Sequence, residues 1–235
     1  MKSLYLLIDF FTIFVPIIFS FHPKINFYKN FKPFFISNIL TASLFLIWDV
    51  IFTKIGVWSF NPDYVLGIYL YNLPIEEILF FVCIPFSCVF TYHCLNLFFL
   101  IQWKPKTENI FVLSFSTLLI IVGIYSYSKL YTIVTFFSLG ILLLVLKYYV
   151  KINWLAKLVI IYPILIIPFF IVNGLLTGSG LDQPVVKYNN MENLGIRLFT
   201  IPVEDVFYGF ELILLNIFLY EYFKTKFSNH SKKTE

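Results

Sequence analysis

Long runs of hydrophobic residues, separated by short polar clusters, make up most of this chain of 235 residues. A membrane-spanning helix needs roughly 20 consecutive, mostly apolar residues. Seven stretches meet this requirement, near residues 4–21, 34–53, 76–101, 110–127, 130–150, 153–173 and 200–223. The pattern therefore predicts an all-α integral membrane protein with about seven transmembrane helices. The first stretch lacks a small-residue cleavage site, so we expect it to be retained rather than removed as a signal peptide.

The composition favours the same fold class. Hydrophobic residues make up 60% of the chain and charged residues 13%, whereas a soluble domain carries about 25% charged residues. The net charge of +4 comes from lysines that flank the hydrophobic stretches, so we expect no nucleic-acid partner. The three cysteines all lie within 76–101 without a CxxC pair or a His-rich tract, which predicts apolar packing and no metal site.

The basic residues of the loops predict the orientation. If the loops alternate between the two sides of the membrane, one side carries five basic residues: Lys2, Lys54, Lys129, Lys187 and Arg197. The other side carries twelve: Lys24, Lys29, Lys32, Lys104, Lys106, Lys147, Lys151, Lys157, Lys224, Lys226, Lys232 and Lys233. The positive-inside rule then predicts an N-terminus outside and a C-terminus in the cytoplasm of a cell-membrane protein.

Two blocks of sequence recur in the same order. The block "GIYLYNLPIEE" from Gly67 aligns with "GIRLFTIPVED" from Gly195, 128 residues later. Upstream, "DVIFTKIG" from Asp49 aligns with "NGLLTGSG" from Asn173. We interpret this as an internal duplication. It predicts a first repeat at 1–104, a linking transmembrane helix at 105–127, a second repeat at 128–225 and a basic C-terminal tail at 226–235.

The duplication also predicts how the repeats lie in the membrane. A three-helix unit ends on the opposite side from where it began, so the linking helix is needed to return the chain to the starting side. The result is two parallel three-helix repeats. Both acid pairs of the repeated block, Glu76 with Glu77 and Glu204 with Asp205, should then lie at the same membrane face, each at the start of a transmembrane helix.

These acid pairs allow two interpretations. A proline followed by acids is a favourable helix start, so each pair could be only a cap. However, four of the thirteen acids of the chain occupy the two copies of one motif. Glu211 lies seven residues beyond Glu204, and Tyr208 lies between them on the same helix face. Ionisable groups inside a membrane helix are costly and usually face a cavity or a partner, and Asp9 and Asp49 add two more such groups.

We therefore favour a chemical role for the carboxyl groups. Carboxyls that lie together in a poorly hydrated pocket do not all ionise. A neutral carboxylic acid beside an ionised one provides a general acid and a general base. Aromatic residues near the motifs could stabilise a passing carbocation and form a slot for a long apolar ligand; they are Trp48, Trp58, Phe80, Phe81, Phe207, Tyr208 and Phe210.

At these residues the sequence resembles the membrane-embedded lycopene cyclase domain family, in the form of a tandem fusion of the two-subunit bacterial type. The segments that carry the resemblance are "GIYLYNLPIEEILFF", "NGLLTG", "PVVKYN" and "LGIRLFTIPVEDVFYGF". The resemblance covers both halves, and the tandem of P-x-E-E and P-x-E-D is specific.

The resemblance implies carotenoid β-cyclisation, the redox-neutral closure of the acyclic ends of lycopene or a similar polyene by intramembrane carboxylates, with no cofactor and no metal. Such an enzyme is an isomerase (intramolecular lyase). Its partners would be the apolar polyene, the lipid bilayer and other carotenoid enzymes.

Carried over by position, Glu76, Glu77, Glu204 and Asp205 form the catalytic acid/base set. Supporting or substrate-binding roles fall to Asp49, Asn173, Arg197, Tyr208, Glu211, Phe80, Phe81 and Trp58. Arg197 could pair with an acid or only anchor the chain at the interface, and Tyr188 and Asn189 could be loop contacts or turn residues. The halves differ at Glu77 against Asp205 and at Asp49 against Asn173, so the two sites need not be equivalent.

Other membrane protein classes fit less well. A prenyltransferase-like enzyme needs two Asp-rich blocks for Mg²⁺ and diphosphate, but the corresponding places read D-x-x-x-T and N-x-x-x-T. A retinal protein would have a lysine in the last span, and residues 200–223 contain none. A membrane protein that binds a carotenoid without changing it remains the main alternative.

Overall fold

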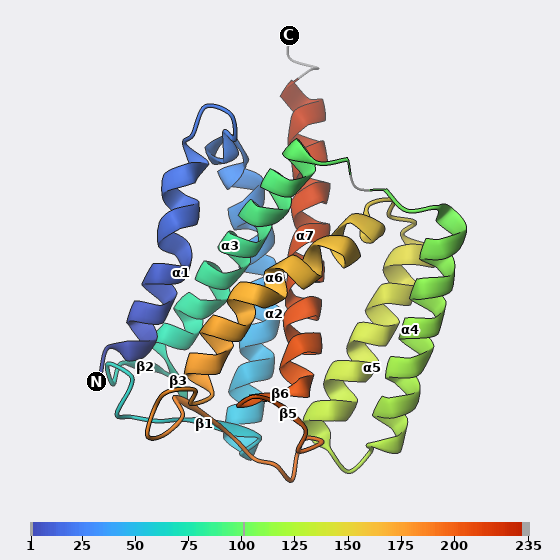
Figure 1. Cartoon of the computed structure of the whole chain (residues 1–235). Helices are drawn as coiled ribbons and strands as arrows, with labels where there is room; N and C mark the ends of the chain where they lie inside the picture. The colour runs from blue at the N-terminus through green and yellow to red at the C-terminus, as the bar shows by residue number, and fades with distance from the viewer. Residues whose placement is uncertain (1, 101, 232–235) are drawn as a thin grey trace. The chain divides into compact units, whose positions relative to one another are not determined.

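The computed structural model describes residues 2–100 and 102–231, and seven α-helices provide most of the structure in these ranges (Figure 1). The helices are α1 (Leu4–Ser20), α2 (Phe31–Ile55), α3 (Ile75–Phe98), α4 (Pro105–Tyr125), α5 (Leu130–Leu144), α6 (Leu155–Leu176) and α7 (Val203–Ser231). A 3₁₀ turn (Phe27–Asn30) precedes α2, and a π-helical turn (Val145–Tyr149) continues α5. Six short strands lie in the loops: β1 (Trp58–Phe60), β2 (Tyr69–Leu70), β3 (Leu73–Pro74), β4 (Val186–Tyr188), β5 (Arg197–Leu198) and β6 (Ile201–Pro202).

Six of the helices are long and apolar enough to cross a membrane, which makes this a multi-pass membrane protein. These spans are Phe27–Ile55, Ile75–Phe98, Pro105–Tyr125, Leu130–Tyr149, Leu155–Leu176 and Val203–Asn229. The remaining predicted span, α1, is also an apolar helix, but it has only 17 residues. At about 1.5 Å per residue it is roughly 25 Å long, slightly less than the hydrocarbon core.

Several helix boundaries differ from the sequence prediction by three or more residues, most of all the start of α4 at Pro105 and the end of α7 at Ser231. The helix α3 ends at Phe98 and does not reach residue 101, which lies outside the described residues, as do Lys232 and Lys233 of the predicted tail. The helix α7 begins at Val203 rather than near residue 200, because Ile201 and Pro202 are paired in a hairpin. A hydrophobic count cannot separate a short apolar strand from the helix that follows it.

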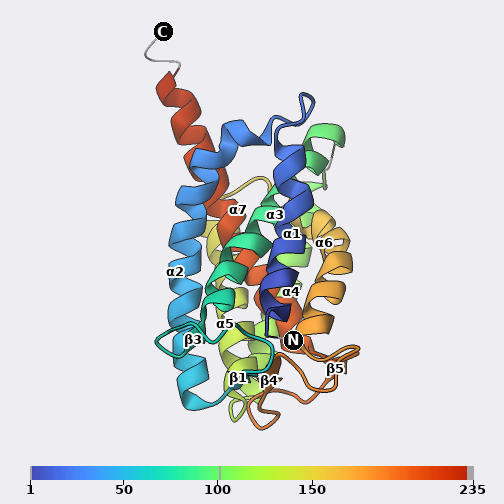
Figure 2. The ribbon, with the colours of Figure 1, turned by 90° about the vertical axis from the view of Figure 1, so that its left-hand side faces the viewer.

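The chain forms two compact units. The first contains α1, α2, α3 and the part of α7 from Leu212 onward; the second contains α4, α5, α6, the part of α7 up to Glu211, and Gly56–Ser59. In the first unit α3 packs against both α1 and α2 (Figure 2). In the second, α4 packs along α5 (Figure 1).

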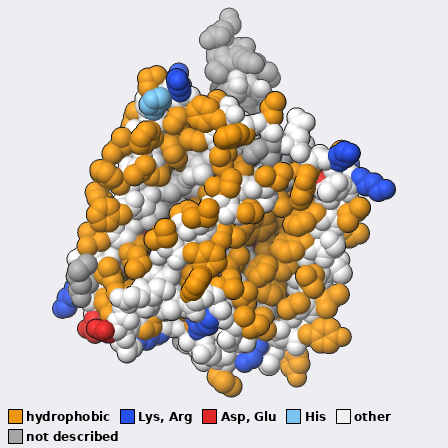
Figure 3. All heavy atoms as spheres, in the orientation of Figure 1, with side chains coloured by type: hydrophobic (Ala, Val, Ile, Leu, Met, Phe, Trp, Pro, Cys, Tyr) orange, Lys and Arg blue, Asp and Glu red, His pale blue; other side chains and the backbone are white. Residues whose placement is uncertain are grey.

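Each unit has an apolar core, and the helix surfaces are also apolar. Phe27, Phe34 and Phe86 form an edge-to-face cluster in the first unit, with ring centroids 5.2–6.4 Å apart, and Leu139 and Leu143 are fully buried in the second. Figure 3 shows hydrophobic side chains along the helix surfaces and Lys and Arg side chains toward their ends. Exposed apolar side chains on long helices are expected where lipid, rather than water, surrounds the protein.

The repeated sequence block forms the same hairpin twice. In β2–β3, Tyr69 pairs with Pro74 and Leu70 with Leu73; in β5–β6, Arg197 pairs with Pro202 and Leu198 with Ile201. The glycines that open the two blocks, Gly67 and Gly195, have φ values of 85° and 71°, which a glycine adopts without steric cost. Each hairpin leads directly into the helix that carries an acid pair, so the predicted duplication is confirmed.

Candidate functional site

The acid pair of the first unit lies in the first turn of α3. Glu76 is 0% exposed, and its Oε1 accepts a hydrogen bond of 2.7 Å from the backbone N–H of Leu66. Its Oε2 is buried and has no hydrogen-bond partner among the described residues. Glu77 is also buried, and its Oε2 accepts a hydrogen bond of 2.5 Å from the Tyr5 hydroxyl on α1. The two neighbouring carboxyls therefore have different surroundings.

The acid pair of the second unit lies in the first turn of α7. Glu204 is 0% exposed, and its Oε1 accepts hydrogen bonds from the backbone N–H of Leu194 (2.8 Å) and from the Thr132 hydroxyl (2.6 Å). Its Oε2 is buried and, like Oε2 of Glu76, has no hydrogen-bond partner among the described residues.

Three donors converge on Asp205. The Tyr131 hydroxyl donates to Oδ1 over 2.6 Å, while the Tyr188 hydroxyl (2.9 Å) and the Asn173 side-chain amide (3.4 Å) donate to Oδ2. Hydrogen bonds to both oxygens stabilise the negative charge that the carboxyl carries when it is ionised. Asn173 therefore orients a motif carboxyl, as the sequence predicted, and Tyr188 belongs to the site. The side-chain carbonyl of Asn189 instead accepts a hydrogen bond from the backbone N–H of Met191 in a turn.

The tyrosines that hold the acids were missed in the sequence. Tyr5 and Tyr131 occupy equivalent places, because "LYLLIDFF" from Leu4 aligns with "LYTIVTFF" from Leu130, 126 residues later. This third repeated block was the available signal. It is weak in sequence because leucine, tyrosine and phenylalanine are common throughout the chain.

The two sites are related but not identical. Leu6 stands where Thr132 stands in the second repeat, and Asp9 stands where Thr135 stands. Asp49 is buried on α2 and interacts electrostatically with Tyr5, whereas its counterpart Asn173 donates to an acid directly. The second unit thus surrounds its acids with hydroxyl and amide donors, and the first unit adds further carboxyls.

The predicted common face of Glu204, Tyr208 and Glu211 is confirmed. All three side chains meet α5: Glu204 at Thr132, Tyr208 at the ring of Tyr131 with centroids 6.1 Å apart, and Glu211 at Ser138, whose hydroxyl donates to Oε2 over 2.8 Å.

Trp58 lies in an aromatic cluster at the second acid pair. Its ring meets those of Tyr131, Tyr188 and Tyr208 with centroid distances of 5.2, 6.0 and 6.3 Å. The cluster includes two of the three donors to Asp205. A residue between the second and third helices of the chain therefore contributes to the surroundings of the acid pair on the last helix.

Three further aromatic candidates, Trp48, Phe80 and Phe81, occupy packing positions in the first unit. Phe80 contacts Tyr5 and Phe81, with ring centroids 6.2 and 5.7 Å away. Phe81 is fully buried against Phe45, and Trp48 stacks on Phe45 at 5.6 Å.

Arg197 forms no salt bridge with an acid among the described residues, although it interacts electrostatically with Asp205. Its guanidinium donates to the backbone carbonyl of Thr200 (3.1 Å) and to the side-chain carbonyl of Asn190 (2.5 Å), and it lies over the ring of Tyr188 at 5.5 Å. Tyr188, which Arg197 covers, in turn donates to Asp205. The Arg197 side chain is instead used to hold the loop at the hairpin, because its fork matches two nearby carbonyl acceptors.

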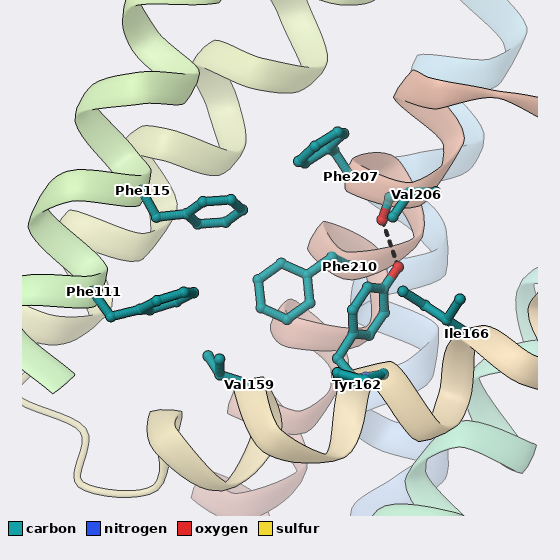
Figure 4. Close-up of a pocket in the computed structure, with 9 residues that line it drawn as sticks. Phe111, Phe115, Val159, Tyr162, Ile166, Val206, Phe207 and Phe210 are labelled. Atoms are coloured by element: carbon teal, nitrogen blue, oxygen red, sulfur yellow. Dashed lines mark hydrogen bonds between the residues drawn. The ribbon is translucent and has the colours of Figure 1, made fainter. Parts of the chain in front are cut away.

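An apolar cavity of about 270 Å³ lies in the second unit among α4, α6 and α7 (Figure 4). Figure 4 shows the rings of Phe111 and Phe115 extending from α4 toward Phe210 of α7. The complete lining is Phe111, Phe115, Val159, Tyr162, Pro163, Ile166, Val206, Phe207 and Phe210. The only polar side-chain group in this lining, the Tyr162 hydroxyl, donates to the carbonyl of Val206. Three of the lining residues, Val206, Phe207 and Phe210, directly follow the acid pair along α7.

Neither acid pair forms part of a metal cluster. Within residues 2–100 and 102–231, no group of three or more His, Cys, Asp or Glu side chains is arranged so that it could hold a metal ion. The carboxyls of the two acid pairs instead have hydroxyl, amide and backbone N–H partners.

Comparison with known proteins gives one result. The sequence model of the lycopene cyclase family matches residues 2–95 and 128–223. The two matched segments contain the two acid pairs and the two tyrosines that hold them. No curated protein and no solved structure shows significant similarity to the chain.

Proposed function

Since this chain belongs to the lycopene cyclase family, and its function is that of a carotenoid cyclase in general terms, we propose that it closes the acyclic ends of lycopene, or of a close relative, into β-ionone rings within the membrane. The observation that carries the proposal is the family match over both repeats, each with an intact, buried acid pair. Six apolar spans are suited to a substrate that is itself dissolved in the bilayer.

The proposed reaction has three steps and is redox-neutral. A carboxylic acid donates a proton to the terminal C1=C2 bond, which leaves a tertiary cation at C1. The electron pair of the C5=C6 bond attacks C1 and closes a six-membered ring, which moves the cation to C5. A carboxylate then removes the proton from C6, and a C5=C6 double bond remains. One proton enters and one leaves, so the enzyme is an isomerase and its carboxyls return to their starting states.

The surroundings of the acids support different roles within each pair. Glu76 and Glu204 each have one buried oxygen without a hydrogen-bond partner in the described structure, so each has an oxygen available to carry and donate a proton. Glu77 and Asp205 each accept a tyrosine hydroxyl, and Asp205 accepts two further donors, so these carboxyls are suited to the ionised role of a base. The proposal therefore predicts different roles for the two members of each acid pair.

Aromatic rings would serve the cationic intermediate. A cation near a ring face is stabilised by the ring quadrupole. The cluster of Trp58, Tyr131, Tyr188 and Tyr208 surrounds the second acid pair, and the phenylalanines of the cavity continue along α7. We assign the cluster to the reacting end of the polyene and the cavity to its apolar chain.

The proposal includes the domain organisation and orientation predicted from the sequence. Residues 1–104 and 128–225 would be the two cyclase repeats, 105–127 the linking helix and 226–235 a basic tail. The N-terminus would lie outside and the C-terminus in the cytoplasm of a cell membrane, where other carotenoid enzymes could supply the substrate. Cysteine accessibility at positions 2 and 187, compared with 157 and 226, would test the orientation.

A carotenoid-binding protein without activity is the second candidate, because the lining of the described cavity contains no carboxyl. Expression in a lycopene-producing host separates the two functions. Conversion of lycopene to monocyclic or bicyclic pigment supports the enzyme. Unchanged lycopene that copurifies with the protein supports the binder, and lycopene that is neither changed nor bound contradicts both.

A further inference from the structure

A buried carboxyl on α1 has no role in the reaction described above. Asp9 is 1% exposed, and neither of its side-chain oxygens has a hydrogen-bond partner in the described structure. A carboxylate that is removed from water without a donor or a cation is costly by several kcal/mol, so such a group keeps its proton instead. A side chain of this kind is seldom kept in a packed helix for packing alone.

The position of Asp9 is fixed by contacts on either side of it. Before it, the Tyr5 hydroxyl on α1 donates to Glu77 on α3 (2.5 Å). After it, the Ser87 hydroxyl on α3 donates to the backbone carbonyl of Thr12 on α1 (2.8 Å). Asp9 follows Tyr5 by four residues, so it lies one turn further along the same helix face. This face is directed at α3.

The second repeat shows what the equivalent face does. There, Thr132 donates to Glu204 over 2.6 Å, and Thr135 is buried one turn further along α5. In the first repeat these two positions are Leu6 and Asp9. The first repeat therefore lacks the hydroxyl donor at the Thr132 position and has a carboxyl one turn further along the same helix.

We infer that Asp9 is a proton-bearing side chain that supplies Glu76 with its proton, and so acts as a positioning residue for the first acid pair. This inference rests on the proposed cyclase function. When Glu76 gives its proton to the polyene, the Asp9 carboxyl passes its own proton to Glu76. The proton that the base removes from C6 then restores Asp9, and no proton is gained or lost overall.

The surrounding side chains are consistent with this role. Asp9 interacts electrostatically with Tyr5 on α1 and with Glu76 and Cys83 on α3, and none of these groups carries a positive charge. Tyr5 in turn interacts with Glu77 and Asp49. Asp9 and Glu76 interact electrostatically but share no direct hydrogen bond. Transfer therefore needs a rotation of one side chain or an intervening water molecule.

Infrared spectroscopy of the purified protein tests the inference without relying on activity. The wild-type protein should show the carbonyl stretching band of a neutral, buried carboxyl. Labelling with ¹³C-aspartate should shift the band, Asp9→Asn should remove it, and Asp9→Glu should leave a band that the aspartate label no longer shifts. If Asp9→Asn does not fold, the infrared spectrum of the Asp9→Glu protein still tests the inference. Neutral glutamates such as Glu76 would give bands that the aspartate label does not shift. A wild-type spectrum without an aspartate-shifted band, or an aspartate-shifted band that survives Asp9→Asn, overturns the inference.

Activity separates proton supply from packing. Asp9→Asn preserves shape but carries no transferable proton, so ring formation should fall by about ten-fold or more, and Asp9→Glu should restore much of it. The matched control is Thr135→Val at the equivalent position of the second repeat, which should retain wild-type rates. Wild-type turnover in Asp9→Asn overturns the inference even if the protein is a cyclase. Failure of the wild type to cyclise lycopene overturns the proposed function, and the infrared result still decides whether Asp9 holds a proton.

Discussion

The hydroxyl of Tyr131 donates a hydrogen bond of 2.6 Å to Oδ1 of Asp205, and both side chains are buried. The first unit contains the same relationship between Tyr5 and Glu77, at 2.5 Å. In both units the tyrosine begins the first helix of a repeat and the acid begins the third. The bond therefore connects the first helix of each repeat to the third helix, next to the acid pair.

Replacing this tyrosine should affect both stability and activity. In Tyr131→Phe, Asp205 loses its shortest hydrogen bond while the ring remains, so we expect the protein to lose about 1–3 kcal/mol of stability. Ring formation should also decrease, because Asp205 is less well oriented. Thermal unfolding in detergent and pigment analysis measure the two effects. Tyr125→Phe, at a tyrosine that is 84% exposed, is the control and should change neither.

Removing the hydroxyl of Thr132 should have a smaller, local effect. Valine has nearly the same shape, so Thr132→Val removes the 2.6 Å hydrogen bond to Glu204 and little else. We expect a loss of about 1 kcal/mol in the free energy of unfolding and a lower rate of ring formation. The hydroxyl of Thr135 has no hydrogen-bond partner in the described structure, so Thr135→Val should be neutral or stabilising. Equal destabilisation by both changes would contradict a role for the bond.

Neutral amides at the acid pairs should abolish chemistry without disturbing insertion. Glu77→Gln and Glu204→Gln keep the side-chain volume but remove a titratable group, so we expect at least about a 100-fold loss of ring formation. Pigment ratios and the amount of membrane-inserted protein should be measured together. Asp182→Asn, on an exposed loop, serves as the control. Wild-type pigment ratios in either glutamine variant would remove that residue from the catalytic set.

Filling the cavity should weaken polyene binding. Val159 lines the cavity of about 270 Å³ on α6, and Val159→Phe would place a ring in this space (Figure 4). We expect a lower yield of cyclised pigment and a raised KM for lycopene, with stability unchanged within about 1 kcal/mol because the space is otherwise empty. Ile164→Phe, on an exposed part of the same helix, is the matched control. An unchanged KM in Val159→Phe would place the polyene elsewhere.

The ion pair between Glu108 on α4 and Lys147 in the π-helical turn should contribute to stability only as a pair. Their charged atoms are 3.0 Å apart, and both side chains are largely buried. Lys147→Met leaves a buried carboxylate without its cation and should cost about 3 kcal/mol. The double change Glu108→Gln with Lys147→Met should recover most of this loss. A double variant as unstable as the single one would show that the lysine contributes through packing.

The sequence alone determined the fold class and the location of the acids. Hydrophobic runs longer than a bilayer requires can only be buried or surrounded by lipid, so the sequence located all seven helices, although several of their ends differ by three or more residues. The duplicated Gly–Pro–acid block identified Glu76, Glu77, Glu204 and Asp205. The period of the helix placed Glu204, Tyr208 and Glu211 on one face, because local geometry fixes that relationship without any knowledge of the neighbouring helices.

Only the tertiary structure decided which residues hold those acids. Tyr5 and Tyr131 lie more than 70 residues from their carboxyl partners, and in an apolar chain nothing in the local pattern distinguishes a tyrosine that holds an acid from one that faces lipid. The same reason explains why the sequence left two roles open for Arg197, and why Trp58 could not be placed with the second pair. Helix formation is governed by neighbours in sequence, whereas the surroundings of a buried carboxyl are set by the packing of helices that are distant along the chain.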